Sequence, residues 1–133
     1  MSEGFKLEIV NPEKSFLSKD GVAEVVVPAF EGDMGILKDH ISIISFLRPG
    51  LLRIIDSKSS EETYYVEDGI IEFKNNCLSV LTSNIFDIKK IDKNKVRDIL
   101  VKAEKEEQNP DISDQAKYLV NHKIEVLKSL TLN

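Results

Sequence analysis

The sequence contains no tryptophan, four prolines and one cysteine, and it has no long hydrophobic run. Because Cys77 has no second cysteine with which to pair, an internal disulfide is excluded and a reducing compartment is expected. The longest apolar stretch, around residues 41–47, is interrupted by two serines and is far shorter than the roughly 18 residues of a membrane helix. We therefore predict no membrane span.

Basic residues are in the minority and form no block. Residues 1–90 carry 10 Lys and Arg against 15 Asp and Glu, whereas residues 91–133 carry 8 of each sign. Because neutralisation of phosphates supplies most of the affinity of proteins for nucleic acids, no nucleic-acid partner is expected. The opening residues lack the basic start and apolar core of a secretion signal, so we expect the chain to stay in the compartment where it is made.

What the chain does have is the composition of a globular protein, with 133 residues of which 41% are hydrophobic and 31% charged. Over residues 5–88, short apolar runs alternate with turn signals, which is typical of an all-β sandwich or barrel, here with about nine or ten strands. Pro28 is expected to end a strand that begins at Val22, and Pro49-Gly50 to form a tight turn. Asp68-Gly69 and Asn75-Asn76 are expected to reverse the chain between neighbouring strands.

Beyond residue 91 the hydrophobic period becomes that of amphipathic helices. The two stripes consist of Val96, Ile99, Leu100 and Ala103, and of Ala116, Leu119, Val120, Ile124 and Leu127. Asp92 is expected to cap the first helix and Asp111 or Ser113 the second, with Pro110 breaking the chain between them. The predicted fold class is thus an antiparallel β-sandwich domain over residues 1–88 and an antiparallel two-helix hairpin over residues 89–133. Because both stripes are narrow, we expect a weakly docked, movable hairpin.

A search for catalytic or metal-binding residues finds little. Asp39, His40 and Ser42 could suggest a nucleophile system, but residues so close in sequence do not normally converge as catalysis requires. His122 and Glu125 are one helical turn apart, yet no third metal ligand is suggested by spacing, and a solvated helix face is the simpler interpretation. Cys77 is best explained as a small packed hydrophobe. We therefore expect no metal, no cofactor and no active site, which favours a binding or coupling subunit.

Residues 27–54 carry an ordered motif of glycines, a histidine and an Arg-Pro-Gly step. Its members are Glu31, Gly32, Gly35, Ile36, His40, Arg48, Pro49, Gly50 and Arg53. This segment closely resembles the signature of the epsilon subunit of F-type ATP synthase, and residues 66–81 resemble the next segment of that family. The order of sandwich and hairpin extends the resemblance over essentially the whole chain.

The resemblance implies a non-catalytic central-stalk subunit of the rotor, which couples the catalytic head to the ring of c subunits. Its sandwich would bind the gamma subunit and the c-ring, and its helices would regulate ATP hydrolysis through transient contact with the alpha/beta head. The c-ring-facing loop would hold Glu31, Gly32, Asp33 and His40. The gamma-facing positions would be Ile44, Ser45 and Glu67. The protein would lie on the cytoplasmic face of a bacterial inner membrane, associated with it only through the complex.

Some members of that family bind ATP between the two helices. The corresponding positions here are Ile91, Asp92, Lys95 and His122. Because lysine cannot reproduce the bidentate contact of arginine with phosphate, we expect no tight ATP site. The second helix, residues 114–130, carries a net charge of only +1, so its inhibition of hydrolysis should be weak and sensitive to salt.

Two alternatives remain open from the sequence. The chain could be a free-standing β-sandwich adaptor, or a small hydrolase that uses Asp39, His40 and Ser42.

Overall fold

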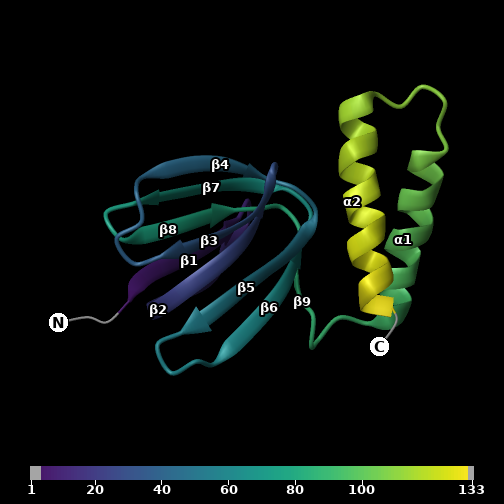
Figure 1. The fold of residues 1–133 in the computed structure, drawn as a ribbon. Helices are drawn as coiled ribbons and strands as arrows, with labels where there is room; N and C mark the ends of the chain where they lie inside the picture. Colours follow the sequence, from purple (N-terminus) through teal and green to yellow (C-terminus); the bar gives the residue numbers. More distant parts are fainter. Residues whose placement is uncertain (1–3, 132–133) are drawn as a thin grey trace.

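The computed structural model describes residues 4–131 and contains a β-sandwich followed by two helices (Figure 1). The strands are β1 (Phe5–Asn11), β2 (Lys14–Ala29), β3 (Gly32–Leu37), β4 (Ile43–Leu47), β5 (Gly50–Asp56), β6 (Glu61–Val66), β7 (Gly69–Lys74), β8 (Cys77–Leu81) and β9 (Ile85–Asp87). The helices are α1 (Lys93–Glu107) and α2 (Asp114–Thr131). The predicted fold class is confirmed. None of the helices in the described part of the chain is long and apolar enough to cross a membrane.

Strand β2 joins the two layers of the sandwich. Its first half pairs with β1, its middle with β5 and its end with β3, all antiparallel. The strand order is β1-β8-β7-β4-β2-β5-β6-β9, and β1 also pairs with β8 in parallel. One layer is therefore built from β1, β8, β7 and β4, and the other from β2, β3, β5, β6 and β9.

The core follows from the alternation of side chains along each strand. Leu7 and Ile9 of β1, Val25 and Val27 of β2, and Ile71 of β7 are all fully buried. Each such side chain contributes roughly 1.5–3 kcal/mol to the stability of the folded state. The sandwich thus has a continuous core of its own.

Two turn predictions meet different outcomes. Asn75 and Asn76 both have positive φ, at 51° and 55°, and they close the β7–β8 hairpin as predicted. The prediction for Asp68-Gly69 is wrong as a hairpin, because β6 pairs with β5 and β9 whereas β7 pairs with β4 and β8. The dipeptide instead carries the chain from one layer to the other. Gly69, at φ 141°, is needed there because a Cβ would strike the carbonyl oxygen of Leu81.

The predictions that Pro28 ends a strand and that Pro49-Gly50 forms a tight turn are also wrong. Pro28 lies within β2, which continues to Ala29, and its carbonyl oxygen accepts a hydrogen bond from the Arg48 amide at 2.9 Å. Pro49-Gly50 is a corner between β4 and β5, which pair with different strands, and Gly50 does not have positive φ. A glycine is required for space, since a Cβ at this position would lie 2.5 Å from the Pro28 Cβ.

The sequence patterns underestimated β2 and missed β3. The first half of β2 contains adjacent Phe16 and Leu17 in place of an alternating pair, and Gly21 has φ 68°. Just after Gly21, the register of pairing with β5 shifts between Val22 and Glu24. In the sequence, this single bulged strand therefore has the pattern of two separate strands. β3 contains two glycines, Gly32 and Gly35, and glycine is unfavourable in strand interiors, so the residue pattern does not indicate a strand here.

Both helices begin at capping residues. The Asp92 side chain accepts a hydrogen bond from the Asn94 amide at 2.9 Å, and the Ser113 hydroxyl oxygen accepts one from the Ala116 amide at 3.1 Å. The Asp92 cap is confirmed, and of the two candidates for α2 Ser113 is the cap. Ala103, Val120 and Ile124 pack between the helices at the end far from the linker.

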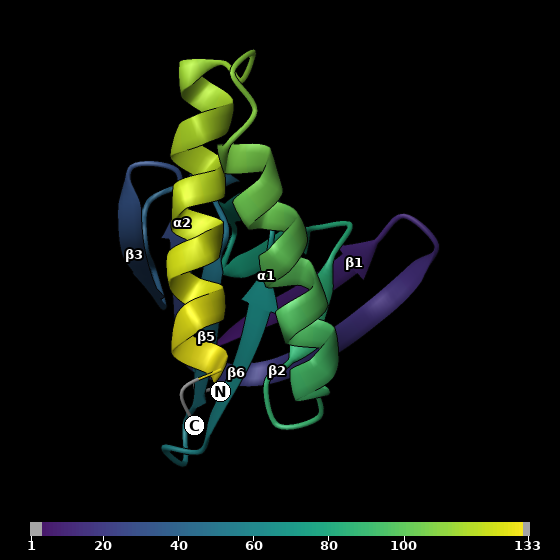
Figure 2. The same ribbon diagram turned by 90° about the vertical axis from the view of Figure 1, so that its right-hand side faces the viewer.

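The hairpin is docked on the sandwich, with α1 and α2 side by side across β5 and β6 (Figure 2). A second cluster around Tyr65, Val96 and Leu127 joins the sandwich, the linker and both helices. Its half-buried members are Leu51, Phe86, Ile88, Ile91, Ile99, Leu100, Val126 and Leu130. The narrow stripes alone do not describe this contact, because apolar residues outside them, such as Ile91, Val126 and Leu130, take part at the linker end. The expectation of a weakly docked, movable hairpin stays a prediction.

The close approach of Pro28 and Gly50 gives a stability prediction. Gly50→Ala should lower the free energy of unfolding by about 1–3 kcal/mol, because the corner is buried and the new methyl group overlaps Pro28. The measurement is urea unfolding followed by circular dichroism.

Gly35→Ala is the matched control, because its Cβ would meet only the movable Glu24 carboxylate. It should leave the free energy of unfolding unchanged or raise it by up to about 1 kcal/mol, because alanine restricts the unfolded chain. Equal effects of the two substitutions would contradict this account of the corner.

Candidate functional site

An uncovered apolar row crosses the outer face of the first layer. Phe46 pairs with Ile70, Ile70 with Leu81, and Leu81 with Val10, so these side chains form one row across four strands. Phe46 is 65% exposed and Leu81 52% exposed. The adjacent Ile44 is 69% exposed on the same face. Exposed apolar side chains gathered in this way are typical of a protein–protein contact surface.

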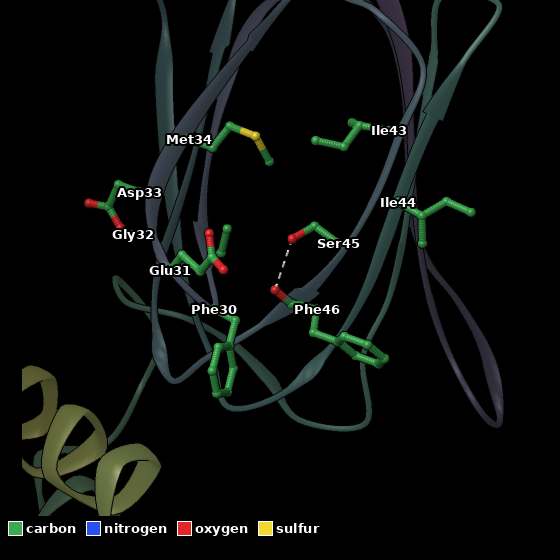
Figure 3. A pocket seen from close by; sticks show the side chains of 10 residues that line it. Phe30, Glu31, Gly32, Asp33, Met34, Ile43, Ile44, Ser45 and Phe46 are labelled. Atoms are coloured by element: carbon green, nitrogen blue, oxygen red, sulfur yellow. Dashed lines mark hydrogen bonds between the residues drawn. The ribbon is translucent and has the colours of Figure 1, made fainter. Parts of the chain in front are cut away.

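A surface groove of about 520 Å³ lies between the β2–β3 turn and β4 (Figure 3). Met34 and Ile43 face one another across it, and Glu31 faces Ser45, whereas Ile44 points away. Ile44 and Ser45 therefore lie on opposite faces of β4, as neighbours in a strand must. Only Ile44 shares the face of the apolar row.

The expected c-ring-facing residues do not form one loop. Glu31 lies in the two-residue turn between β2 and β3, and Gly32 and Asp33 begin β3. Gly32 has φ 150°, which favours glycine directly after the turn. His40 lies beyond the other end of β3, where its Nδ1 is 2.7 Å from the carbonyl oxygen of Ile41 and its ring meets the Phe73 ring edge-on. β3 separates His40 from the other three.

Glu67 also lies apart from Ile44 and Ser45. Its carboxylate forms an ion pair with Lys123 of α2 at 3.3 Å, and each side chain is 19% exposed. The Tyr65 hydroxyl donates to the same carboxylate at 3.4 Å. Burial and the neighbouring Glu67 charge raise the pKa of Tyr65, so its hydroxyl stays protonated as a donor. Glu67 thus helps to fasten the hairpin.

The four positions considered for nucleotide contact are dispersed. Asp92 caps α1, Ile91 packs in the cluster at the linker, and the Lys95 ammonium lies 4.7 Å from the centre of the Phe86 ring. His122 is on α2, where its Nε2 accepts a hydrogen bond from Arg48 at 3.2 Å. The structure brings no two of them into a common phosphate cradle.

Asp39, His40 and Ser42 are not arranged for catalysis. The Asp39 carboxylate accepts from the Asn76 amide group at 2.9 Å, and the Asp39 backbone amide donates to the Asn76 side chain at 2.7 Å. Within residues 4–131, no hydrogen bond joins His40 to Ser42 or to Asp39. These residues connect the β3–β4 loop to the β7–β8 turn.

The described residues also contain no group of three or more histidine, cysteine, aspartate or glutamate side chains placed to hold a metal ion. His122 Nδ1 lies 4.0 Å from Glu125, but the Arg48 guanidinium occupies the other side of the ring. Cys77, at the start of β8, is half-buried.

Sequence reasoning missed two features of this surface. Phe46, Ile70 and Leu81 were assigned to strands without recognition that their register aligns them on one uncovered face. Tyr118 was not considered at all, although its hydroxyl donates to the Phe30 carbonyl oxygen at 2.7 Å and joins α2 to the β2–β3 turn. The apolar alternation could have indicated the row, but pairing across β4, β7 and β8 is not visible in the sequence.

Comparisons with known proteins agree with this architecture. Residues 4–88 match the family described as ATP synthase, Delta/Epsilon chain, beta-sandwich domain. The ATP synthase epsilon chain of Pelagibacter ubique (strain HTCC1062) is 71% identical over 130 residues, which cover 98% of this chain and 99% of that protein.

Two solved structures share the fold at lower identity. A chain of the Euglena gracilis mitochondrial ATP synthase, OSCP/F1/c-ring in rotational state 1, aligns with a TM-score of 0.79 and 21% identity, covering 97% of this chain and 82% of that chain. A chain of the Tetrahymena thermophila mitochondrial ATP synthase, central stalk/c-ring, aligns with a TM-score of 0.65 and 17% identity, covering 98% and 99%. The sandwich, the two helices and the extent of the match to the Pelagibacter protein lead to one conclusion: the chain belongs to the family of ATP synthase delta/epsilon chains.

Proposed function

We propose that this protein is a non-catalytic central-stalk subunit of an F-type ATP synthase, which couples the catalytic head to the c-ring. The observation that carries the proposal is the uncovered apolar row of the sandwich, which offers a surface for contact with another subunit. No catalytic groups are assembled on this surface in the described residues. The similarity to the ATP synthase epsilon chain of Pelagibacter ubique and to a chain of the Tetrahymena central stalk/c-ring structure supports the assignment to the complex. The protein has no active site or cofactor of its own and joins the membrane only through the complex, on the cytoplasmic face in a bacterium.

The gamma subunit is the proposed partner of the apolar row. Ile44 contributes to this surface together with Phe46, Ile70 and Leu81. Burial of such side chains in a partner interface removes apolar area from water, which is the main source of affinity in stable subunit contacts. Ser45 faces the neighbouring groove, and Glu67 acts from the hairpin side by holding Lys123.

The β2–β3 turn is the proposed contact with the c-ring. Glu31 and Asp33 are exposed and acidic, and Gly32 lies between them directly after the reversal of the chain. A short turn between two paired strands presents these carboxylates on a rigid support. His40 belongs to the opposite end of β3 and supports this contact only indirectly, through the position of that strand.

The hairpin, in residues 89–133, is the proposed regulatory part. It makes transient contact with the alpha/beta head and inhibits ATP hydrolysis weakly, because α2 carries little net charge with which to bind acidic surfaces. The dispersion of Ile91, Asp92, Lys95 and His122 argues against a tight ATP site between the helices. The regulation proposed here therefore does not depend on nucleotide binding to this subunit.

A charge in the apolar row tests the gamma contact. Phe46→Asp should weaken binding of the full chain to purified gamma subunit at least about tenfold, because a carboxylate would have to be desolvated in an apolar interface. Affinity is measured by calorimetry. Val101→Asp is the control, since Val101 is 52% exposed on α1 and distant from the row. Equal losses in both variants would contradict the assignment of this face.

The turn is tested in the assembled synthase. Glu31→Lys combined with Asp33→Lys should reduce proton-coupled ATP synthesis while gamma binding remains within about twofold of the unmodified chain, because both carboxylates are exposed and their replacement leaves the backbone bond from the Phe30 amide to the Phe46 carbonyl oxygen in place. Glu61→Lys with Glu62→Lys, on the β6 side, is the charge-matched control. Unchanged synthesis in the turn variant would argue against a c-ring contact here.

Removal of the hairpin tests the division of roles. A chain lacking residues 91–133 should retain gamma binding and coupled synthesis, and should raise ATP hydrolysis by less than about twofold, since the weak charge of α2 is screened by salt. Circular dichroism must first confirm a folded sandwich, because the deletion uncovers Tyr65 and Leu51. Loss of gamma binding by a folded truncated chain would show that the roles are misassigned.

A further inference from the structure

Helix α2 contacts the β2–β3 turn through one tyrosine. The Tyr118 hydroxyl donates to the Phe30 carbonyl oxygen at 2.7 Å and accepts from Arg48 Nη1 at 3.0 Å. The Tyr118 and Phe30 rings also pack together, with centroids 5.2 Å apart. Arg48, Tyr118 and the turn carbonyl thus form a chain of hydrogen bonds, in which each bond polarises and strengthens the next.

Besides the pairing of β2 with β3, two backbone bonds restrain the turn. Phe30 donates its amide to the Phe46 carbonyl oxygen at 2.9 Å, and the Arg48 amide donates to the Pro28 carbonyl oxygen at 2.9 Å. These two backbone bonds tie the turn to the β4–β5 corner, the segment that carries the Arg48 side chain to α2. The backbone of residues 46–48 therefore restrains the β2–β3 turn and also carries Arg48, whose side chain binds Tyr118 of α2.

His122 adds a proton-sensitive member, one helical turn after Tyr118. Its ring packs edge-on against the Tyr118 ring at 4.6 Å, and its Nε2 lies 3.2 Å from Arg48 Nη1. Because a guanidinium can only donate, Nε2 must accept, and the imidazole must be neutral with its proton on Nδ1. A second proton on Nε2 would remove this acceptor and place two cations against one another.

We propose that Arg48, Tyr118 and His122 form a latch that couples docking of α2 to the conformation of the β2–β3 turn, and that protonation of His122 opens the latch. An open latch removes the Tyr118 contact from Phe30 and so loosens the turn, at the same time as it frees the first half of α2. This coupling is a property of the isolated chain and does not depend on contact with a c-ring or with a gamma subunit.

The charges around His122 set the direction of the effect. A groove of about 530 Å³ beside it is lined by Arg48 and Arg53 from the β4–β5 region, by Asp33 from β3 and by Glu125 from α2. Burial and Arg48 lower the pKa of His122, while Glu125 opposes them. The Glu125 side chain is 80% exposed, so solvent screens its attraction.

The sign of the pH dependence follows from this lowered pKa. An undocked, solvated His122 has an ordinary pKa of about 6.5, above that of the docked state. Docking is therefore strongest at pH values above 6.5 and weakens as the pH falls through and below that value, because the undocked state takes up the proton more readily.

The test of coupling is amide hydrogen exchange of the full chain, measured by NMR at pH 7.5. Tyr118→Phe keeps the ring and removes the hydroxyl. It should speed exchange of the Phe30 amide in the turn and of the Lys117 amide in α2 by about fivefold each, equivalent to about 1 kcal/mol. Tyr64→Phe, which removes a hydroxyl bound to Glu62 at 2.9 Å, is the matched control and should leave both amides unchanged.

Faster exchange in α2 with no change at Phe30, or no change at either amide, would overturn the coupling. The proton-sensitive part is tested separately by following the Phe30 amide signal between pH 7.5 and pH 5. The chain has only two histidines, so His40→Gln should preserve the transition and His122→Gln should abolish it. A transition that follows His40, or none in that range, would overturn the role of His122.

Discussion

The close approach of strand β2 to the β4–β5 corner is the constraint on which the arrangement of the functional surfaces depends. Gly50 allows the two backbones to meet at Pro28, and the Arg48 and Phe30 amides then bond across the junction. This junction fixes Phe46 on the outer face and directs the Arg48 side chain towards α2. Because one set of backbone bonds positions the apolar row, the turn and the helix contact, a change in these bonds alters all three.

The hairpin combines two kinds of attachment. Near the linker, Tyr65, Val96 and Leu127 bury apolar surface, which is non-directional and relatively insensitive to pH. In the part of α2 farther from the linker, the contacts of Lys123, Tyr118 and His122 are polar and directional. A helix held in this way can release its polar end while the apolar end remains in place, so partial undocking requires less free energy than complete extension.

The sequence predicted those features that local patterns determine. The period of two in the strands and of 3.6 in the helices, the Asp92 cap and the Asn75-Asn76 turn all depend on neighbouring residues. What could not be predicted depends on pairing between distant strands. Asp68-Gly69 has the composition of a hairpin turn, but the strands on either side of it pair with other strands. Ile44 and Ser45 could not be assigned to different surfaces, because the sequence does not show which face of β4 is covered. The Arg48–Tyr118 contact joins residues 70 positions apart, and no local pattern indicates it.

The parallel pairing of β1 with β8 has a consequence for biosynthesis. Residues 6–10 find these partners only in residues 77–81, so the first strand made by the ribosome must wait for most of the sandwich before its pairing is complete. The helices, in contrast, contact one another across a short connection and can form quickly once their residues are released. Completion of the sandwich should therefore be the slow step that limits how soon the two helices can dock on it.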